Sequence, residues 1–414
     1  MEIIKVVTAG SVDDGKSTLI GRLLYETKSL KDDQIEHIEN KSLSKGYDYL
    51  DFSLATDGLL TEREQGITID VSNIFFSTNL RRFIIADSPG HVEYTRNMVT
   101  GASTASAAIV LLDARKGVIE QTKRHFYITQ LLGIDHIIFA VNKMDLVNYD
   151  KLKFDSIIFD LKNLIEHKGN ESLNPYFIPI SALKGSNIVD ISQNMSWYNG
   201  PTFLSLLENL PIENETKKDE NAFQVQFVIR PKTEKYHDYR GFAGKVKSGK
   251  FSVGDKVKIH PSNRFSVIKK LEKYGSSVND LNNNENGVII LEDEVDVSRG
   301  CSILSETFSI KNSKQLIANI SWLQENPLKV QGIYWLQQGT QKVKVKIKSI
   351  NNSVNLHNLK FEKTLELKLN DIGEISIICS EPIITRSFKK NKALGSFILI
   401  DQNTNNTAGV GLVI

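Results

Sequence analysis

The chain has 414 residues, 40% of them hydrophobic and 24% charged, which is enough for two or three globular domains with buried cores. A formal net charge of +2 argues against a protein that binds long nucleic acid mainly through its charge. Two cysteines and the lack of an apolar run long enough to span a bilayer predict neither a disulfide framework nor a membrane protein. We expect no signal peptide and a cytoplasmic location.

The first half of the sequence alternates apolar runs with amphipathic segments. The apolar runs predict strands at residues 3–7, 72–77, 82–87, 107–112, 136–141 and 176–180. The amphipathic segments predict helices at residues 18–25, 92–103, 121–132, 151–168 and 201–210. Residues 28–68 form a long polar segment. This order predicts an α/β domain with a mostly parallel sheet, in which ligands bind at the carboxyl ends of the strands.

A short polar segment at residues 212–220 is expected to be a linker, and the pattern changes beyond it. Short strands with glycine-rich turns are predicted at residues 223–230, 241–247, 256–260, 287–291, 342–350, 364–369, 373–379 and 395–400. A second break falls at residues 305–315. We therefore predict three domains, which are the α/β domain at residues 1–212 and two small β-barrels at residues 221–305 and 316–414.

A glycine loop follows the first predicted strand and precedes the first predicted helix. Its spacing, G-x-x-x-x-G-K-S, is that of loops whose backbone N–H groups surround phosphate oxygens at a helix N-terminus. Lys16 adds a positive charge for the β- and γ-phosphates, and the Ser17 hydroxyl is a Mg²⁺ ligand in this pattern. The alternative is an ordinary glycine-rich turn without a ligand. The predicted strand before the loop and helix after it favour phosphate binding instead. The predicted nucleotide-binding residues are Gly10, Ser11, Val12, Asp13, Asp14, Gly15, Lys16, Ser17 and Thr18.

Three further stretches follow predicted strands in the order that a guanine-nucleotide switch requires. After the third strand, Asp87 can hold Mg²⁺ through a water and the Gly90 N–H can reach the γ-phosphate. After the fifth strand, the Asp145 carboxylate can accept hydrogen bonds from two donors that guanine has and adenine lacks. After the sixth strand, a backbone N–H can donate to the guanine O6. The predicted nucleotide-binding residues of these stretches are Asp87, Ser88, Pro89, Gly90, His91, Asn142, Lys143, Met144, Asp145, Ser181, Ala182 and Leu183.

Catalytic roles are predicted for Lys16, Thr68 and His91. Thr68 ends the polar segment and is expected to ligate Mg²⁺ while the γ-phosphate is present, together with Ser17 and Asp87. The neutral ring of His91 can orient the attacking water, although a lone histidine is more often structural. No residue suggests an arginine finger, so we expect slow turnover that a partner raises, by about 10³–10⁵ in systems that supply one.

A second stretch, residues 244–250, also fits the glycine-loop spacing. There, however, Phe251 occupies the position of the hydroxyl that binds Mg²⁺. It lies between predicted strands and no helix is expected after it. We interpret it as a hairpin of the first barrel and predict no second nucleotide-binding loop.

The motifs and the two barrels resemble those of the translation-factor GTPases, close to elongation factor Tu. Several details are similar to one branch of that family, the large GTPase subunit of bacterial heterodimeric sulfate adenylyltransferase. These are the loop variant with Asp14, the Glu-Arg-Glu-Gln stretch at residues 62–65 and the sequence from His91 to Thr104. Ser88 departs from this branch, which more often has threonine there. The carboxy-terminal kinase domain of some members is not expected in this chain.

The resemblance implies that the chain binds GTP and Mg²⁺ and that its partner is a catalytic adenylyltransferase subunit, in a heterodimer or a larger assembly. The partner would handle ATP and sulfate and form adenosine 5′-phosphosulfate and pyrophosphate, an uphill reaction that GTP hydrolysis drives. No nucleic acid and no membrane are expected. Two alternatives stay open. One is a GTP-dependent carrier of aminoacyl-tRNA, which salt-sensitive tRNA binding would reveal, and the other is a signalling GTPase.

Overall fold

The computed structural model describes the following residues: 3–44, 46–47, 49–55, 72–88, 105–134, 136–166, 173–211, 220–231, 239–309, 314–355 and 360–414. The chain forms two compact units. The first consists of residues 1–212 and 355–360, and the second of residues 213–354 and 361–414. Both β-barrels belong to the second unit, so the limits of the three domains stay a prediction.

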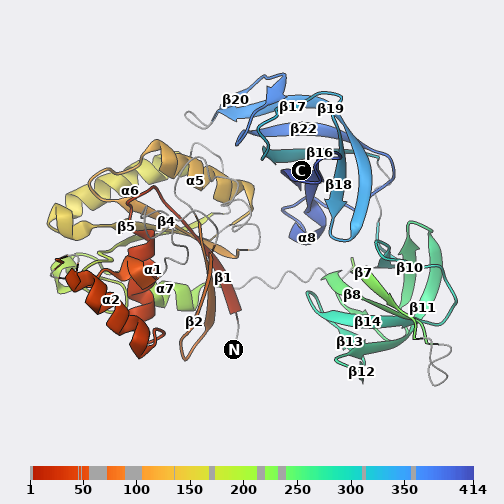
Figure 1. Cartoon of the computed structure of the whole chain (residues 1–414), viewed down its shortest axis with the longest axis horizontal. Coiled ribbons are helices and arrows are strands. Elements are labelled where there is room, and N and C mark those ends of the chain that lie inside the picture. The colour runs from red at the N-terminus through yellow and green to blue at the C-terminus, as the bar shows by residue number, and fades with distance from the viewer. Residues whose placement is uncertain are drawn as a thin grey trace. The chain divides into compact units, whose positions relative to one another are not determined.

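The first unit is built on a six-stranded sheet of order β2-β3-β1-β4-β5-β6 (Figure 1). Its strands are β1 (Ile3–Ala9), β2 (Ser72–Ser77), β3 (Arg82–Asp87), β4 (Ala107–Asp113), β5 (His136–Asn142) and β6 (Asn174–Pro179). All neighbouring pairs are parallel except β2 with β3, because β2 is an antiparallel edge strand. The prediction of an α/β domain with a mostly parallel sheet is confirmed.

Helices pack on both faces of this sheet. The helices of the first unit are α1 (Lys16–Glu26), α2 (Asp32–Ser44), α5 (Glu120–Leu131), α6 (Lys151–Glu166) and α7 (Phe203–Asn209), of which α2 packs against the 3₁₀ turn η1 (Phe52–Ala55). One apolar cluster joins α1 and α7 to alternate residues of the strands, such as Val6 and Ile109. On the other face, Phe126 of α5 packs against Phe139 of β5, with ring centroids 5.9 Å apart. Strand residues that point in opposite directions are thus both buried, which is why β4 and β5 are apolar throughout.

The polar segment at residues 28–68 contains structure that the sequence did not reveal. It includes α2 and the 3₁₀ turn η1 (Phe52–Ala55). In α2 the buried residues are Ile38 and Ser42, so its helical periodicity is weak. A Cβ atom on Gly21 of α1 would lie 1.9 Å from the Phe52 carbonyl oxygen, so η1 packs directly on the α1 backbone. The helix predicted at residues 92–103 lies outside the described residues.

The second unit contains two closed barrels, as predicted, although the second half also has one short helix, α8 (Lys392–Gly395). The first consists of β7 (Ala222–Ile229), β8 (Gly241–Ser248), β10 (Lys256–His260), β11 (Arg264–Lys273), β14 (Asn286–Leu291) and β15 (Ser302–Ser305). The second consists of β16 (Gln315–Trp322), β18 (Ile333–Gln338), β19 (Gln341–Asn355), β22 (Ile372–Cys379), β23 (Ser396–Ile400) and β24 (Thr407–Val413). Pairing of β10 with β11 closes the first barrel, and pairing of β18 with β19 closes the second.

Two details of the barrels differ from prediction. The strand expected at residues 364–369 is reduced to the short β21 (Glu366–Leu367), which pairs with β17 (Leu328–Lys329). The stretch at residues 244–250 is not a hairpin, because β8 pairs with β7 and β14 whereas the following β9 (Phe251–Ser252) pairs with β13 (Asp280–Leu281). No helix follows it.

The two barrels contact each other through buried groups. A small apolar cluster takes residues from both of them. The buried Gln224 of β7 donates through Nε2 to the Gln338 carbonyl oxygen of β18 at 3.0 Å. The Thr340 hydroxyl, in the turn after β18, donates to the Val225 carbonyl oxygen of β7 at 2.9 Å. The interface therefore combines apolar burial with satisfied hydrogen bonds. The members of the cluster are Ala222, Leu304, Phe308, Ile384 and Leu394.

None of the helices in the described part of the chain has the length and apolar character that crossing a membrane requires.

Candidate functional site

The glycine loop lies against the carboxyl ends of β4 and β5. Gly15, directly before α1, has a φ of 94°, in the left-handed region that glycine adopts with little strain. A Cβ atom on Gly15 would lie 2.5 Å from Nδ2 of Asn142, and one on Gly10 would lie 3.1 Å from Cβ of Leu111. The close approach to both strands explains why glycine is needed at these two positions.

Two oppositely charged side chains of the loop are buried. Lys16, only 7% exposed, donates through Nζ to the Gly10 carbonyl oxygen at 2.9 Å and to the Ser11 carbonyl oxygen at 3.1 Å. Burial lowers the pKa of Lys16, opposed mainly by the nearby Asp87. The ammonium therefore lies within the loop, beside the helix N-terminus, which is the arrangement that a phosphate group requires.

Asp14 is 2% exposed, and its Oδ2 accepts a hydrogen bond from the Ser11 N–H at 2.6 Å. Burial raises the pKa of Asp14, although that hydrogen bond and the charge of Lys16 act in the opposite direction. Its Oδ1 is buried and has no hydrogen-bond partner among the described residues. Asp14 thus fixes the start of the loop. The other predicted loop residues, Val12, Asp13, Ser17 and Thr18, are at least partly accessible.

Replacing Gly15 with alanine should reduce both stability and nucleotide binding. A φ of 94° is strained for alanine, and the added methyl group would displace the Asn142 amide. We expect the free energy of unfolding to fall by about 1–3 kcal/mol and GTP affinity to fall at least tenfold. Chemical denaturation and titration with a fluorescent GTP analogue measure the two effects.

Gly254→Ala is the matched control, because Gly254 has a φ of 91° and a Cβ atom there would meet nothing within 4 Å. This variant should lose stability through backbone strain and keep its nucleotide affinity. Equal GTP affinity in the two variants would contradict the proposed contact between the loop and Asn142.

Asn142 connects three segments at the end of β5. Its Nδ2 donates to the Asp14 carbonyl oxygen at 2.8 Å, and its Oδ1 accepts from the Ala182 N–H at 2.9 Å. Because Asn142 is almost completely buried, both bonds are shielded from water. The side chain therefore sets the distance between the phosphate loop and the turn after β6.

Lys143 strengthens the same connection from the next position. Its backbone has a φ of 65°, and its Nζ donates to the Asp13 carbonyl oxygen and lies 3.1 Å from the Asp113 carboxylate. Burial would raise the pKa of Asp113, but hydrogen bonds from Arg115 and Lys143 outweigh it and hold the pKa well below its usual range. Asp113 is therefore ionised and fixes Lys143 at neutral pH.

Asp145 is positioned by the turn after β6. The Ser181 hydroxyl donates to its Oδ1 at 2.6 Å, and the Lys184 N–H donates to the Ser181 oxygen at 3.2 Å. Met144 is fully buried, so it anchors this segment rather than offering a polar contact. Ala182 is buried and Leu183 half-buried in the same turn. A half-buried carboxylate held in this way is suited to two adjacent N–H donors, as guanine presents.

The candidate metal ligands in the described residues are oxygen donors near the loop. Asp87 is buried at the end of β3, where the Thr8 hydroxyl donates to its Oδ1 at 2.7 Å. Ser17 is in the first turn of α1, and the buried Ser88 hydroxyl has no hydrogen-bond partner among the described residues. Hydroxyl and carboxylate oxygens fit Mg²⁺, which usually keeps several waters and phosphate ligands. Thr68, Pro89, Gly90 and His91 lie outside the described residues.

Three supporting residues were missed by sequence reasoning. Thr8 and Asp113 are at the carboxyl ends of β1 and β4. Each directly follows a predicted strand, and this shared position is the signal that could have identified them. His125 of α5 is fully buried, and burial together with the charge of Lys16 lowers its pKa to about 3. Its Nε2 lies 3.1 Å from Nε2 of Gln121. His125 is therefore neutral, and its position gave no signal in the sequence.

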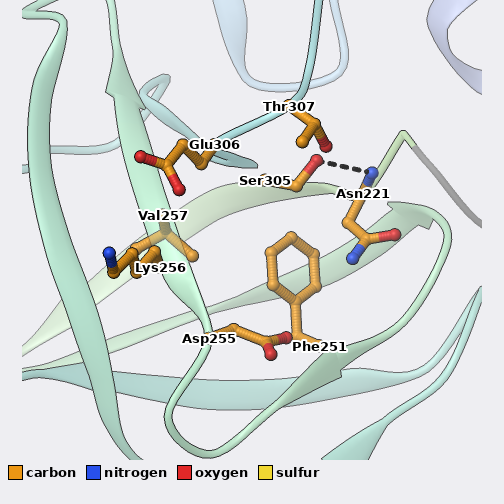
Figure 2. A pocket seen from close by; sticks show the side chains of 8 residues that line it. All are labelled: Asn221, Phe251, Asp255, Lys256, Val257, Ser305, Glu306 and Thr307. Atoms are coloured by element: carbon orange, nitrogen blue, oxygen red, sulfur yellow. Dashed lines mark hydrogen bonds between the residues drawn. The ribbon is translucent and has the colours of Figure 1, made fainter.

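A separate hollow of about 230 Å³ lies in the first barrel. Figure 2 shows the ring of Phe251 in its middle, with Ser305 accepting a hydrogen bond from the Asn221 N–H at 3.2 Å. Asp255 at its edge already accepts the Ser252 N–H at 2.8 Å. The hollow is smaller than usual ligand pockets, and these polar groups bind each other. The glycine loop therefore remains the candidate site.

Comparisons with known proteins extend over the whole chain. Residues 1–211 match the family model of the elongation factor Tu GTP binding domain, and residues 315–414 match the model described as GTP-eEF1A C-terminal domain-like. Sulfate adenylyltransferase subunit 1 of Bacteroides thetaiotaomicron is 42% identical over 424 residues, which cover 100% of this chain and 86% of that protein. The protein of the same name from Photorhabdus laumondii is 42% identical over 413 residues, covering 99% and 85%. A solved structure, sup35 complexed with GMPPNP, covers 100% of this chain and 94% of its own at 20% identity, with a TM-score of 0.45.

Proposed function

Because the chain belongs to the family of sulfate adenylyltransferase subunit 1, with a nucleotide domain of the elongation factor Tu type, we propose that it is the GTPase subunit of a sulfate adenylyltransferase. In this function GTP hydrolysis on the chain drives a catalytic partner subunit, which forms adenosine 5′-phosphosulfate and pyrophosphate from ATP and sulfate. The partner would bind ATP and sulfate, and the pair would work in the cytoplasm.

The observation that carries the proposal is the pair of hydrogen bonds made by Asn142. They hold the phosphate loop and the turn after β6 at a fixed separation. A nucleotide whose phosphates lie in the loop would then present its base to Asp145, which Ser181 orients. Asp145 would accept the N1–H and the exocyclic amine of guanine, and the turn after β6 would donate an N–H to O6.

The residues proposed for phosphoryl transfer surround the loop. Lys16 and the loop N–H groups would bind the β- and γ-phosphates, and Ser17, Thr68 and the water-linked Asp87 would hold Mg²⁺. The metal would supply positive charge to the phosphate oxygens. His91 would orient the attacking water, and Thr68 would change its contacts once the γ-phosphate has left. The residues of the chain would thus act by holding the phosphates and the attacking water in the arrangement that the transfer requires.

The test is GTP turnover by the full chain, alone and with the catalytic adenylyltransferase subunit, ATP and sulfate. We expect slow turnover alone and a rise of at least about tenfold when all three are present, because the partner completes the catalytic geometry. With GTP present, adenosine phosphosulfate should accumulate beyond the equilibrium level that is reached when GTP is absent.

Mixtures that lack sulfate, or that contain a non-hydrolysable GTP analogue, are the controls and should show neither effect. Turnover that ignores sulfate but responds to ribosomes and charged tRNA would instead support an aminoacyl-tRNA carrier and contradict the proposal.

A further inference from the structure

Strand β19 of the second barrel carries four lysines on its outer face. They alternate with buried apolar residues, because successive side chains of a strand point to opposite faces. At about 3.4 Å per residue, the α-carbons of neighbouring lysines are about 7 Å apart and the row is about 20 Å long. All four are exposed. The residues of this row are Lys342, Lys344, Lys346 and Lys348.

The charges of the row are not balanced within the part of the chain that the structure describes. None of the four lysines forms an ion pair with a described residue, although ion pairs occur elsewhere in the barrels. Lys348 donates to Oε1 of Gln315 at 3.3 Å, a neutral partner. The residues next to Lys346 on the two flanking strands are Ile333 and Ile378. Like charges on one sheet face repel, so the row weakens the free barrel.

Protection of a sheet edge does not account for the row. Lysines often prevent edge strands from pairing with other molecules. β19, however, pairs with β18 over residues 341–346 and with β22 over residues 345–353, so it is an inner strand of the barrel and each lysine lies beside at least one neighbouring strand.

Apolar and aromatic side chains border the row. Ile333 of β18 is 55% exposed and is in register with Lys346. Trp335 of the same strand is in register with Lys344, and its ring is 5.1 Å from Nζ of Lys342 and 5.6 Å from Nζ of Lys344. An exposed isoleucine beside a tryptophan is typical of the centre of a protein interface, and charged groups such as the lysines are typical of its polar rim.

We propose that the lysine row of β19, with Trp335 and Ile333, is a docking surface for an acidic segment of the partner protein. Given the function proposed above, on which this inference rests, that partner is the catalytic adenylyltransferase subunit. Carboxylates spaced along the segment would pair with the four ammonium groups, and an apolar side chain of the segment would cover Ile333, beside Trp335. Binding would thereby relieve the repulsion within the row.

A protein partner is favoured over single-stranded nucleic acid by the state of Trp335. Bases bind such surfaces mainly by stacking on aromatic rings. Two lysine ammoniums already lie over this ring, so a base would have to displace both. The near-neutral net charge of +2 also gives little general attraction for a polyanion.

The experiment measures the affinity of the full chain for the catalytic subunit over a range of salt concentrations. Replacing the four lysines of the row with glutamine should weaken binding about 10- to 100-fold at low salt and flatten its salt dependence. Replacing them with arginine should preserve binding. The control replaces four other exposed lysines of the same barrel with glutamine and should bind normally. The control positions are Lys363, Lys368, Lys389 and Lys390.

Fluorescent GTP analogue binding should be the same in every variant, which shows that the nucleotide domain is intact, and equal thermal unfolding of the glutamine and control variants shows that the barrel is folded. An unchanged affinity of the glutamine variant for the catalytic subunit would overturn the docking surface while the heterodimer, and with it the proposed function, survives. Failure of the unsubstituted chain to bind the catalytic subunit would overturn both. Salt-sensitive binding of a single-stranded oligonucleotide, lost only in the glutamine variant, would overturn the inference in favour of nucleic acid.

Discussion

Replacing Asp145 with asparagine should weaken GTP binding by about 10³–10⁴-fold. The amide NH₂ of the asparagine would then face one of the two N–H donors of guanine and could not accept its hydrogen bond. The same change should create affinity for xanthosine triphosphate. Xanthine has a carbonyl group at C2 where guanine has an amine, and an amide offers one acceptor and one donor in place of two acceptors. The Ser181 hydroxyl, which donates to Oδ1 of Asp145, should also hold the new side chain in place.

Competition of both nucleotides against a fluorescent GTP analogue measures this exchange of specificity. Asp160→Asn, an exposed substitution on α6, is the control for the loss of one negative charge and should leave both affinities unchanged. Should the Asp145 variant bind GTP as the parent does, the base would be recognised elsewhere and our assignment of the site would be wrong.

Replacing Lys16 with methionine should reduce GTP affinity by at least about 10³-fold, since charged hydrogen bonds to two phosphate groups would be lost. The fold itself should not suffer. Burial lowers the pKa of Lys16, which means that its charge is unfavourable in the protein without nucleotide. Methionine fills a similar volume without that charge, so the free energy of unfolding without GTP should be equal or higher.

Isothermal titration with GTP and chemical denaturation without it separate the two effects of this substitution. Lys116→Met changes an exposed lysine near Asp14 and should alter neither quantity appreciably. If GTP affinity in the Lys16 variant fell in proportion to a loss of stability, the lysine would have a structural role, contrary to our proposal.

Local patterns in the sequence were sufficient to predict the fold and to propose the segments of the candidate site. Apolar strands end in polar residues, and the glycine loop has a spacing that few other structures require. These features depend on neighbours in the sequence, so Gly15 and Asp145 could be identified without a structure. α2 could not, because Ile38 is its one buried apolar residue among the described positions and an almost fully polar helix has no clear period.

The connections within the site were not predictable for a different reason. Asn142 was expected as part of the base-binding motif, but its partners Asp14 and Ala182 are 128 and 40 positions away. Such bonds depend on the order of strands in the sheet, which the pattern of one strand does not contain. The same holds for Trp335 and the lysine row, because the alternation in β19 is visible in the sequence whereas the identity of its neighbour strand is not.

The buried contact between the two barrels reduces the number of independently moving parts. Gln224 and Gln338 would both lose a shielded hydrogen-bond arrangement if the barrels separated, and the apolar residues around them would meet water. A force applied to one barrel is therefore transmitted to the other rather than absorbed between them. The two barrels would then move together as one rigid body joined to the nucleotide domain. A partner bound to either barrel would therefore be displaced by any movement of the pair.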